Sequence, residues 1–401
     1  MKTSWQTKKL TELCEVFADG DWIEKKDQSR EGIRLIQTGN IGSGYFKDRG
    51  EKARYVSEKT FHRLNCTEIL PKDCLVSRLP DPVGRACIIP ETREKMITAV
   101  DCTIIRFKNE VLPQWFVDYS LSHEYQNQIN SEVGGATRQR ISRANLGQIE
   151  IPLPTLAEQK RIVKRLDEVF EKLSKAKENA EKNLQNSKEL FESYLQSVFT
   201  NPDKDWEEKK IKEIGVTQTG LTPKTANKKY YGNFVPFITP ADVDISGDGS
   251  VRYDNKGLSE EGLEVGRKIE KDSVLMVCIG ATIGKVGFST QVISCNQQIN
   301  TLTPFDGYDS KLFYYILSTK SFFNKVIKAS SQATLPIINK GKWENLSVSF
   351  PKSISEQKAI VKKLEALSIE TKKLEKIYEQ KLTDLGELKK SVLRQAFHAK
   401  L

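Results

Sequence analysis

The chain has 401 residues, more than one ordinary domain uses, so two or three folding units are expected. Its longest apolar runs, such as 274–279, fall far short of the roughly 20 residues of a membrane-spanning helix, and its charged N-terminal segment does not resemble a signal peptide. We therefore expect no membrane span and a cytoplasmic location. The formal net charge of +10 favours a polyanionic partner, although many basic proteins bind no nucleic acid.

Residues 1–150 are expected to form a first domain of mixed α/β structure. Short apolar runs between Gly, Asn, Asp and Pro residues predict strands at 32–37, 67–76, 85–89 and 103–107. An amphipathic stretch predicts one helix over 113–131. Residues 39–44 are rich in glycine, but in the wrong order for a dinucleotide-binding motif, so we interpret them as a loop.

Residues 151–200 are expected to form a first long helix. From Ile162 to Ala180 the apolar residues follow alternating steps of four and three, which is the seam of a coiled coil, and a further step of four to Leu184 interrupts the heptad. The repeated part, 158–199, would make a rod of roughly 60 Å, far longer than an ordinary core helix. The predicted helix-packing residues are Ile162, Leu166, Val169, Leu173 and Leu184.

Residues 201–349 are expected to form a second domain of the same class. Strands are predicted at 235–239, 273–279 and 285–288, and one helix over 310–330. The segment 280–286, GATIGKV, looks like a phosphate-binding loop. It has one residue too few between its glycines and a Val where Ser or Thr should meet magnesium, so we predict a strand–turn–strand there instead.

Residues 350–401 are expected to form a second long helix that repeats the first. Segments 158–199 and 356–397 align without a gap at an offset of 198 residues, with 15 of 42 positions identical. The same irregular step occurs at Tyr378–Leu382, so the two helices are suited to pack together. The helices carry charges of +1 and +3, which leaves +6 elsewhere in the chain. The predicted packing residues of the second helix are Ile360, Leu364, Leu367, Leu374 and Leu382.

Signatures of catalysis are not found. The Asn/Asp-Pro-Pro-aromatic motif of amino-methyltransferases is absent, because Asp81-Pro82 and Asn201-Pro202 lack the second proline and the aromatic residue. Three histidines and no metal-binding spacing of carboxylates give no nuclease or hydrolase pattern. Seven scattered cysteines without a C-x-x-C pair indicate reduced thiols in the core rather than disulfides or zinc. We predict a non-catalytic chain without a metal or cofactor of its own.

The motifs that open each long helix carry a family resemblance. The first consists of Pro154, Glu158, Gln159, Ile162 and Val163; the second, one residue longer, consists of Pro351, Glu356, Gln357, Ile360 and Val361. Further motifs are the C-terminal SVLRQAFHAKL at 391–401, GLTP at 220–223 with YYG at 230–232, and GDWI at 20–23 leading into GNI at 39–41. In these motifs the chain resembles the specificity subunit of Type I restriction–modification systems over essentially its whole length.

The resemblance implies a tandem repeat with an approximate two-fold axis: two α/β target-recognition domains separated by two long antiparallel coiled-coil helices. Each domain would read one half of an interrupted double-stranded DNA site, and the helices would set the spacing between the halves. The implied partners are two modification subunits, which bind S-adenosylmethionine and methylate adenine, and restriction/translocase subunits that use ATP.

Candidate DNA-binding residues are side chains in loops that can hydrogen-bond to base edges or phosphates. In the first domain they are Asn40, Ser43, Arg49, Arg54, Arg78, Arg85, Arg138, Arg140 and Arg143. In the second domain they are Thr219, Thr222, Lys224, Lys228, Lys229, Tyr230, Lys285, Gln297, Gln298 and Gln332. For each of them a solvated surface role is the competing interpretation. None is carried over from the family, because its base-contacting positions lie in its least similar regions.

Two other functions compete with DNA recognition. A coiled-coil scaffold protein without DNA readout would show no steep loss of DNA affinity as salt rises, whereas a DNA-binding protein would. An enzyme acting on DNA by itself would transfer methyl groups without partner subunits.

Overall fold

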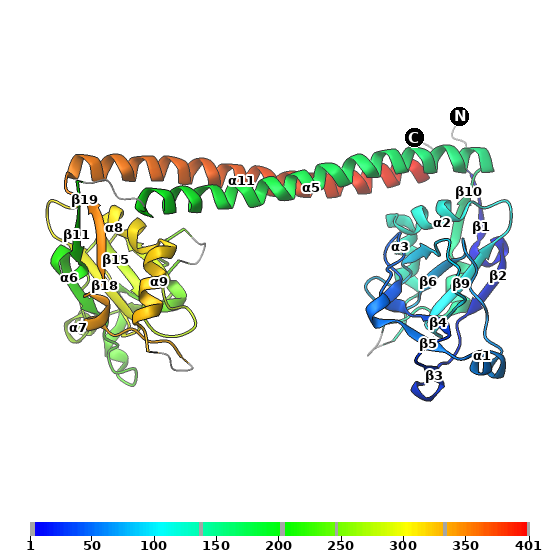
Figure 1. Ribbon diagram of the computed structural model, residues 1–401, viewed down its shortest axis with the longest axis horizontal. Helices are drawn as coiled ribbons and strands as arrows, with labels where there is room; N and C mark the ends of the chain where they lie inside the picture. The colour runs from blue at the N-terminus through cyan, green and yellow to red at the C-terminus, as the bar shows by residue number, and fades with distance from the viewer. Residues whose placement is uncertain (1–4, 136–138, 201–204, 245–247, 332–334, 399–401) are drawn as a thin grey trace. The chain divides into compact units, whose positions relative to one another are not determined.

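The computed structural model describes residues 5–135, 139–200, 205–244, 248–331 and 335–398 (Figure 1). The chain divides into two compact units, one made of residues 1–181 with 380–401 and the other of residues 182–379. Each unit therefore contains one globular domain and a part of both long helices. Within the described ranges, no helix is both long enough and apolar enough to cross a membrane.

The first unit contains two four-stranded sheets and a two-stranded one. One sheet has the antiparallel order β2-β9-β6-β7, the second has the order β3-β5-β4-β8 with β4 and β8 parallel, and β1 pairs with β10. The strands are β1 (Gln6–Lys9), β2 (Cys14–Asp19), β3 (Gln28–Ser29), β4 (Ile33–Ile36), β5 (Arg54–Val56), β6 (Cys74–Ser77), β7 (Ala86–Ile88), β8 (Met96–Thr98), β9 (Cys102–Phe107) and β10 (Glu150–Leu153). The helices of this domain are α1 (Glu58–Leu64), α2 (Pro113–Ser120), α3 (His123–Glu132) and α4 (Arg143–Gln148).

The second unit repeats this arrangement with the order β12-β18-β15-β16 in one sheet, β14-β13-β17 in the next, and the pair β11-β19. Its strands are β11 (Trp206–Lys210), β12 (Gly215–Thr219), β13 (Tyr231–Ile238), β14 (Gly257–Leu258), β15 (Ser273–Val277), β16 (Val286–Ser289), β17 (Ser294–Cys295), β18 (Ile299–Pro304) and β19 (Ser347–Pro351). Its helices are α6 (Ile211–Ile214), α7 (Glu260–Val265), α8 (Ser310–Leu317), α9 (Lys320–Ala329) and α10 (Lys340–Trp343). The mixed α/β class predicted for both domains is confirmed.

Most predicted strands match observed ones, but each predicted domain helix is two helices. The expected helix over 113–131 is α2 followed by α3, and that over 310–330 is α8 followed by α9. The break occurs because Ser122 and Thr319 cap the second helix of each pair, accepting the backbone N–H groups of Tyr125 and Phe322 with their hydroxyls. The strand predicted over 67–76 is also shorter, since only its end lies in β6. Residues 280–286 join the antiparallel strands β15 and β16, so the strand–turn–strand prediction is confirmed.

The long helices are α5 (Leu156–Thr200) and α11 (Ile354–Phe397). Ile162 and Leu166 of α5 and Leu364 of α11 are fully buried. Val169, Leu173, Leu184, Ile360, Leu367 and Leu382 are half-buried. Leu374 is a correction to the predicted packing set: it is 36% exposed, and the buried side chain on this turn of the helix is Thr371.

Each globular core extends onto both long helices. In the first unit, Leu166 of α5 and Phe397 of α11 belong to the same apolar cluster as Trp115 of α2, whose ring lies 4.7 Å from that of Phe397. In the second unit, Leu195 of α5 and Leu364 of α11 join the core. The start of one helix thus meets the end of the other within each unit, which is the antiparallel arrangement that the family resemblance implies.

The seven cysteines are free, and six of them are buried. Burial raises the pKa of the Cys102 and Cys278 thiols to about 12, so both are protonated at neutral pH. The predicted placement of the cysteines in the core is confirmed for six of the seven.

Candidate nucleic-acid interface

The two domains share their frame but differ in chemistry at the edge of the main sheet. This edge is formed by the first strand of the sheet, β2 or β12, and the short helix α4 or α10 that precedes the last strand of the domain. In the first domain the phenyl ring of Phe17 lies against Gly147. In the second domain Thr217 and Glu344 occupy the corresponding positions, and the Thr217 hydroxyl donates to Glu344 Oε2 at 2.6 Å.

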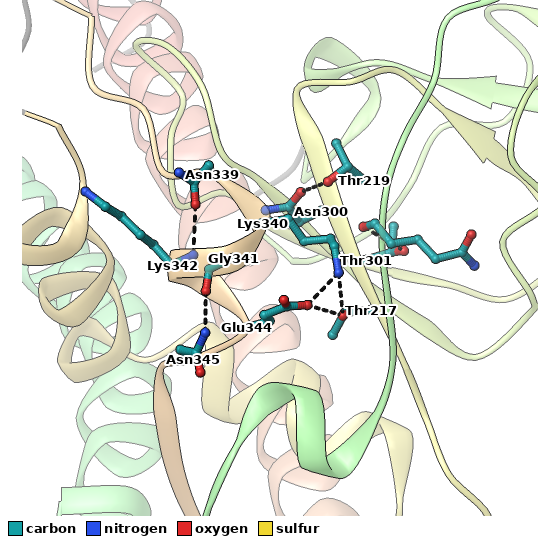
Figure 2. Close-up of polar contacts among 11 residues, drawn as sticks. Thr217, Thr219, Asn300, Thr301, Asn339, Lys340, Gly341, Lys342, Glu344 and Asn345 are labelled. Atoms are coloured by element: carbon teal, nitrogen blue, oxygen red, sulfur yellow. Dashed lines mark hydrogen bonds and ion pairs between the residues drawn. The ribbon is translucent and has the colours of Figure 1, made fainter.

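Lysine completes this polar group in the second domain, as Figure 2 shows. Lys340 Nζ donates to Glu344 Oε2 at 2.6 Å and to the Thr217 hydroxyl at 3.2 Å. The hydrogen bond from Lys340, then that from Thr217, lowers the pKa of the Glu344 carboxyl. Asn339 caps α10 by accepting the N–H of Lys342 at 2.8 Å.

A second contrast lies two residues further along the same strands. Thr219 of β12 donates its hydroxyl hydrogen to Asn300 Oδ1 of β18 at 2.7 Å, and the Asn300 Nδ2 group is buried without a hydrogen-bond partner. In the first domain the paired residues are Asp19 of β2 and Thr103 of β9, whose hydroxyl donates to Asp19 at 3.3 Å. The half-buried Asp19 also pairs with Arg78 at 3.3 Å. At this pair of positions the first domain is therefore ionic, with Asp19 paired to Arg78, and the second domain is neutral, with Thr219 bonded to Asn300.

Three predicted DNA-binding residues are committed to contacts inside the first domain. The Arg85 guanidinium is buried and donates to five backbone carbonyls. Arg78 is buried between the carbonyls of Val100 and Ile141, and burial lowers its pKa. The Asn40 side chain is buried and bonds to the backbone of Gln37 and Lys47. We therefore interpret these three as supports for the surrounding loops.

The other predicted residues that the structure describes in the first domain are exposed. Ser43 lies at the tip of a turn that the N–H of Gly42 closes on the carbonyl of Tyr45. Arg140 and Arg143 flank the start of α4 and face the carboxylates of Asp101 and Asp19 at 3.8 and 3.9 Å. These distances leave donors of both guanidinium groups available. Arg49 and Arg54 are also exposed, and Arg138 lies outside the described residues.

Two loops of the second domain bring several predicted residues together. The Thr222 hydroxyl donates to Gln297 Oε1 at 2.6 Å, which joins the loop after β12 to the loop before β18. Gln298 Oε1 accepts from Asn296 at 2.9 Å. Lys285 lies apart from this group, with Nζ 3.4 Å from the carbonyl of Asp244. Lys224, Lys228 and Lys229 are exposed, Tyr230 is half-buried, and Gln332 lies outside the described residues.

A buried glutamine links each domain to its long helix. Gln159 is fully buried near the start of α5; its amide oxygen accepts the N–H of Leu112 at 2.8 Å, and its amide nitrogen donates to the carbonyls of Glu110 and Pro154 at 2.9 and 3.0 Å. These contacts hold the chain that enters α2. This role of Gln159 is not evident from the sequence alone, although an identical Gln at the start of both long helices is a signal for it.

Gln357 makes the same connection in the second unit. It is fully buried, accepts the N–H of Asp309 at 2.9 Å and donates to the carbonyl of Pro351 at 2.7 Å. Buried amides are stable only when their donors and acceptors are paired. The repeated Glu-Gln motif therefore supplies a structural joint rather than a binding group.

Taken together, the fold and these surfaces define a tandem pair of α/β domains, each joined to two long helices and each carrying a different polar surface. The model of the Type I restriction modification DNA specificity domain matches residues 2–183 and again residues 203–383. The chain belongs to this family, and DNA sequence recognition is its function.

Curated relatives share this description over different lengths of the chain. The putative Type I restriction enzyme MjaX specificity subunit of Methanocaldococcus jannaschii is 24% identical over 400 residues, covering 93% of this chain and 89% of the relative. The MjaIX specificity subunit of the same organism is 28% identical, but the match spans 39% of this chain and 36% of that protein. The EcoBI specificity subunit of Escherichia coli is 26% identical, with 69% and 64% covered.

Solved structures show the same fold. A chain from a study of complex assembly and conformational transition in the type I restriction–modification system aligns with a TM-score of 0.79 at 19% identity, covering 100% of this chain and 99% of that chain. The HsdS subunit of Thermoanaerobacter tengcongensis aligns with a TM-score of 0.64 at 18% identity, with 100% and 98% covered.

Proposed function

We propose that this chain is the DNA-recognition subunit of a Type I restriction–modification complex and that each globular domain reads one half of an interrupted DNA site. Helices α5 and α11 set the spacing between the half-sites and dock two modification subunits. The observation that carries the proposal is the contrast between a repeated frame and unlike surfaces. Gln159 and Gln357 repeat the joint, whereas Phe17 with Gly147 is replaced by Thr217 with Glu344.

A repeated frame with unlike polar edges suits two different half-site sequences. Sequence is read by hydrogen bonds and apolar contacts at base edges, while lysine and arginine contacts to phosphates position the protein. Exposed Arg140 and Arg143 in the first domain can supply both kinds of contact. In the second domain, Lys228 and Lys229 provide positive charge beside the joined loops of Thr222 and Gln297, which suits phosphate contacts.

The proposal assigns catalysis to partner subunits. The chain reads DNA without a cofactor of its own, S-adenosylmethionine binds to the modification subunits that methylate adenine, and ATP binds to the restriction/translocase subunits. A cytoplasmic location follows from the proposal, because the ligand is chromosomal or invading DNA.

The direct test is to co-express the chain with its modification subunit and to map adenine methylation across a genome. Methylation at one interrupted, asymmetric motif is the expected result. A double variant, Arg140→Ala with Arg143→Ala, should relax or abolish recognition of one half of the motif and leave the other half unchanged. Arg30→Ala with Arg93→Ala, at two exposed arginines of the first domain outside the candidate set, is the matched loss of two positive charges and should leave both halves unchanged.

A verified, assembled complex that methylates no specific motif would contradict the proposal. Binding of that complex to DNA would then be measured against salt. An affinity that does not fall with increasing salt would favour the scaffold function, since each phosphate contact contributes about −0.9 to the slope of log affinity against log salt.

A further inference from the structure

One face of each domain is built from equivalent elements. The elements are the second helix of the capped pair, α3 or α9, and the loop that returns after it. Ser122 caps α3 and Thr319 caps α9, and isolated bridges join Gly134 to Arg140 and Ser331 to Ile337. The two caps and the two bridges are each separated by 197 residues along the chain, so positions on the two faces correspond one to one.

The corresponding side chains have opposite chemistry. Gln126, Asn130 and Arg140 of the first domain are replaced in the second by Phe323, Ile327 and Ile337. The second set is exposed by 38%, 39% and 37%, and Leu335 of the same loop is exposed by 50%. We call Phe323, Ile327, Leu335 and Ile337 the α9 face, and Gln126, Asn130 and Arg140 the α3 face.

The α9 face surrounds the glycine-rich loop between β15 and β16. A Cβ atom placed on Gly284 would lie 2.4 Å from the Phe323 ring, and the residue has a φ of +87°, so only glycine fits there. The N–H of Gly280 donates to the carbonyl of Pro336 at 3.1 Å, and Leu335 lies next to Gly280. The four apolar side chains therefore form one patch around the loop at 280–284, whose glycines carry no side chains of their own.

Positive charge borders this patch. Lys320 lies one helical turn before Phe323 on the same side of α9, and its side chain is exposed. Apolar side chains with a lysine beside them suit a DNA groove, where the methyl groups of thymine lie between two rows of phosphates.

The difference between the two faces selects DNA over a protein partner. Two copies of one modification subunit would need similar surfaces on the two domains. Two different half-site sequences need dissimilar surfaces. The face of the first domain carries amide and guanidinium groups at the positions where the face of the second domain carries apolar groups.

We propose that the α9 face contacts thymine methyl groups in the major groove of the second half-site, and that the exposed Asn130 and Arg140 of the α3 face hydrogen-bond to base edges in the first. Gln126 of that face supports α3 instead, because its amide nitrogen donates to the carbonyl of Ser120 at 3.1 Å. This inference rests on the proposed function. It assigns the two faces as specificity surfaces and predicts that the second half-site contains A·T pairs besides that of the methylated adenine.

The test uses the assembled complex and duplexes that carry its mapped motif. Each thymine of the second half-site is replaced in turn by deoxyuridine, which keeps base pairing and the O4 acceptor but lacks the methyl group. We expect affinity to fall about fourfold for each methyl group that is buried against the α9 face. Deoxyuridine in the first half-site should change nothing at this level.

Variants connect the effect to the face. Phe323→Ala with Ile327→Ala should weaken binding to thymine duplexes and remove the penalty for deoxyuridine in the second half-site. Phe305→Ala with Val216→Ala, at two exposed apolar residues outside the face, is the matched control and should keep that penalty. Because the deoxyuridine series needs no substitution, it remains decisive even if a variant folds poorly.

Three outcomes would overturn the inference while the proposed function stands: a second half-site without additional A·T pairs, affinities unchanged by deoxyuridine, or loss of modification subunits from the Phe323→Ala, Ile327→Ala complex. The last would assign the face to protein docking. Failure of the proposed function itself is distinguishable, because no interrupted motif would then be methylated.

Discussion

The joint formed by Gln159 allows a quantitative test of how the first domain is attached to α5. In Gln159→Ala the N–H of Leu112 and the carbonyls of Glu110 and Pro154 lose their partner. Each lost hydrogen bond costs about 1 kcal/mol net, so local stability should fall by about 3 kcal/mol. At 1.4 kcal/mol per factor of ten, the opening equilibrium around Leu112 should increase by roughly 100-fold.

Amide hydrogen exchange measured on the whole chain can detect this opening peptide by peptide. The peptide that contains Leu112 should exchange roughly 100-fold faster in Gln159→Ala, while the peptide that contains Asp309 keeps its rate. Gln357→Ala should produce the reverse pattern, because Gln357 accepts the N–H of Asp309. Gln159→Glu keeps the acceptor for Leu112 but, when ionised, cannot donate to either carbonyl, so it should be destabilising as well.

Gln185→Ala is the control, because Gln185 is exposed on α5 and its amide nitrogen donates to the Glu189 side chain one turn further along the same helix. It should change exchange near Leu112 by less than a factor of about two. Unchanged exchange at Leu112 in Gln159→Ala, or equal acceleration in both domains, would refute the view that each glutamine is a local joint for its own domain.

Three further predictions concern packing, titration and coupling. Leu166→Ala should lower the free energy of unfolding by about 2–5 kcal/mol, whereas Leu374→Ala should change it by less than about 1 kcal/mol. Urea unfolding measures both changes, and equal losses of unfolding free energy would contradict the assigned burial. Burial, and to a lesser extent the nearby Asp167, raises the pKa of Asp118 to about 7 in the folded chain, so the folded state holds a proton that the unfolded state releases between about pH 4 and 7. The free energy of unfolding should therefore fall by up to about 4 kcal/mol as pH rises through this window. Asp118→Asn should remove this pH dependence in thermal melts recorded from pH 4 to 8. A variant with the same pH profile as the unmodified chain would refute the assignment to Asp118. Thr217→Phe and Glu344→Gly should each destabilise the second domain. The double variant should lose at least about 0.5 kcal/mol less unfolding free energy than the sum of the two single losses, because the first domain packs Phe17 against Gly147 at the same positions. Strict additivity in a double-mutant cycle would show that the two positions do not couple.

The sequence by itself determined the tandem organisation, the two long helices, the mixed α/β class and the burial of most cysteines. These features depend on short-range periodicity and on self-similarity, which a single chain displays without tertiary contacts. The positions of Ile162 and Leu166 in the seam followed from the alternating steps of four and three, and both residues are fully buried.

The tertiary structure decided which polar residues are available and what the repeated motifs do. Arg78, Arg85 and Arg140 all occur in glycine-containing loops and look alike in sequence, but long-range contacts bury the first two against backbone carbonyls and leave the third exposed. The break between α2 and α3 depends on one capping hydroxyl, that of Ser122, which an apolar stripe does not reveal. The role of Gln159 and the opposite chemistry of the α3 and α9 faces became visible only when residues distant in sequence were placed side by side, because burial and hydrogen bonding are properties of that proximity.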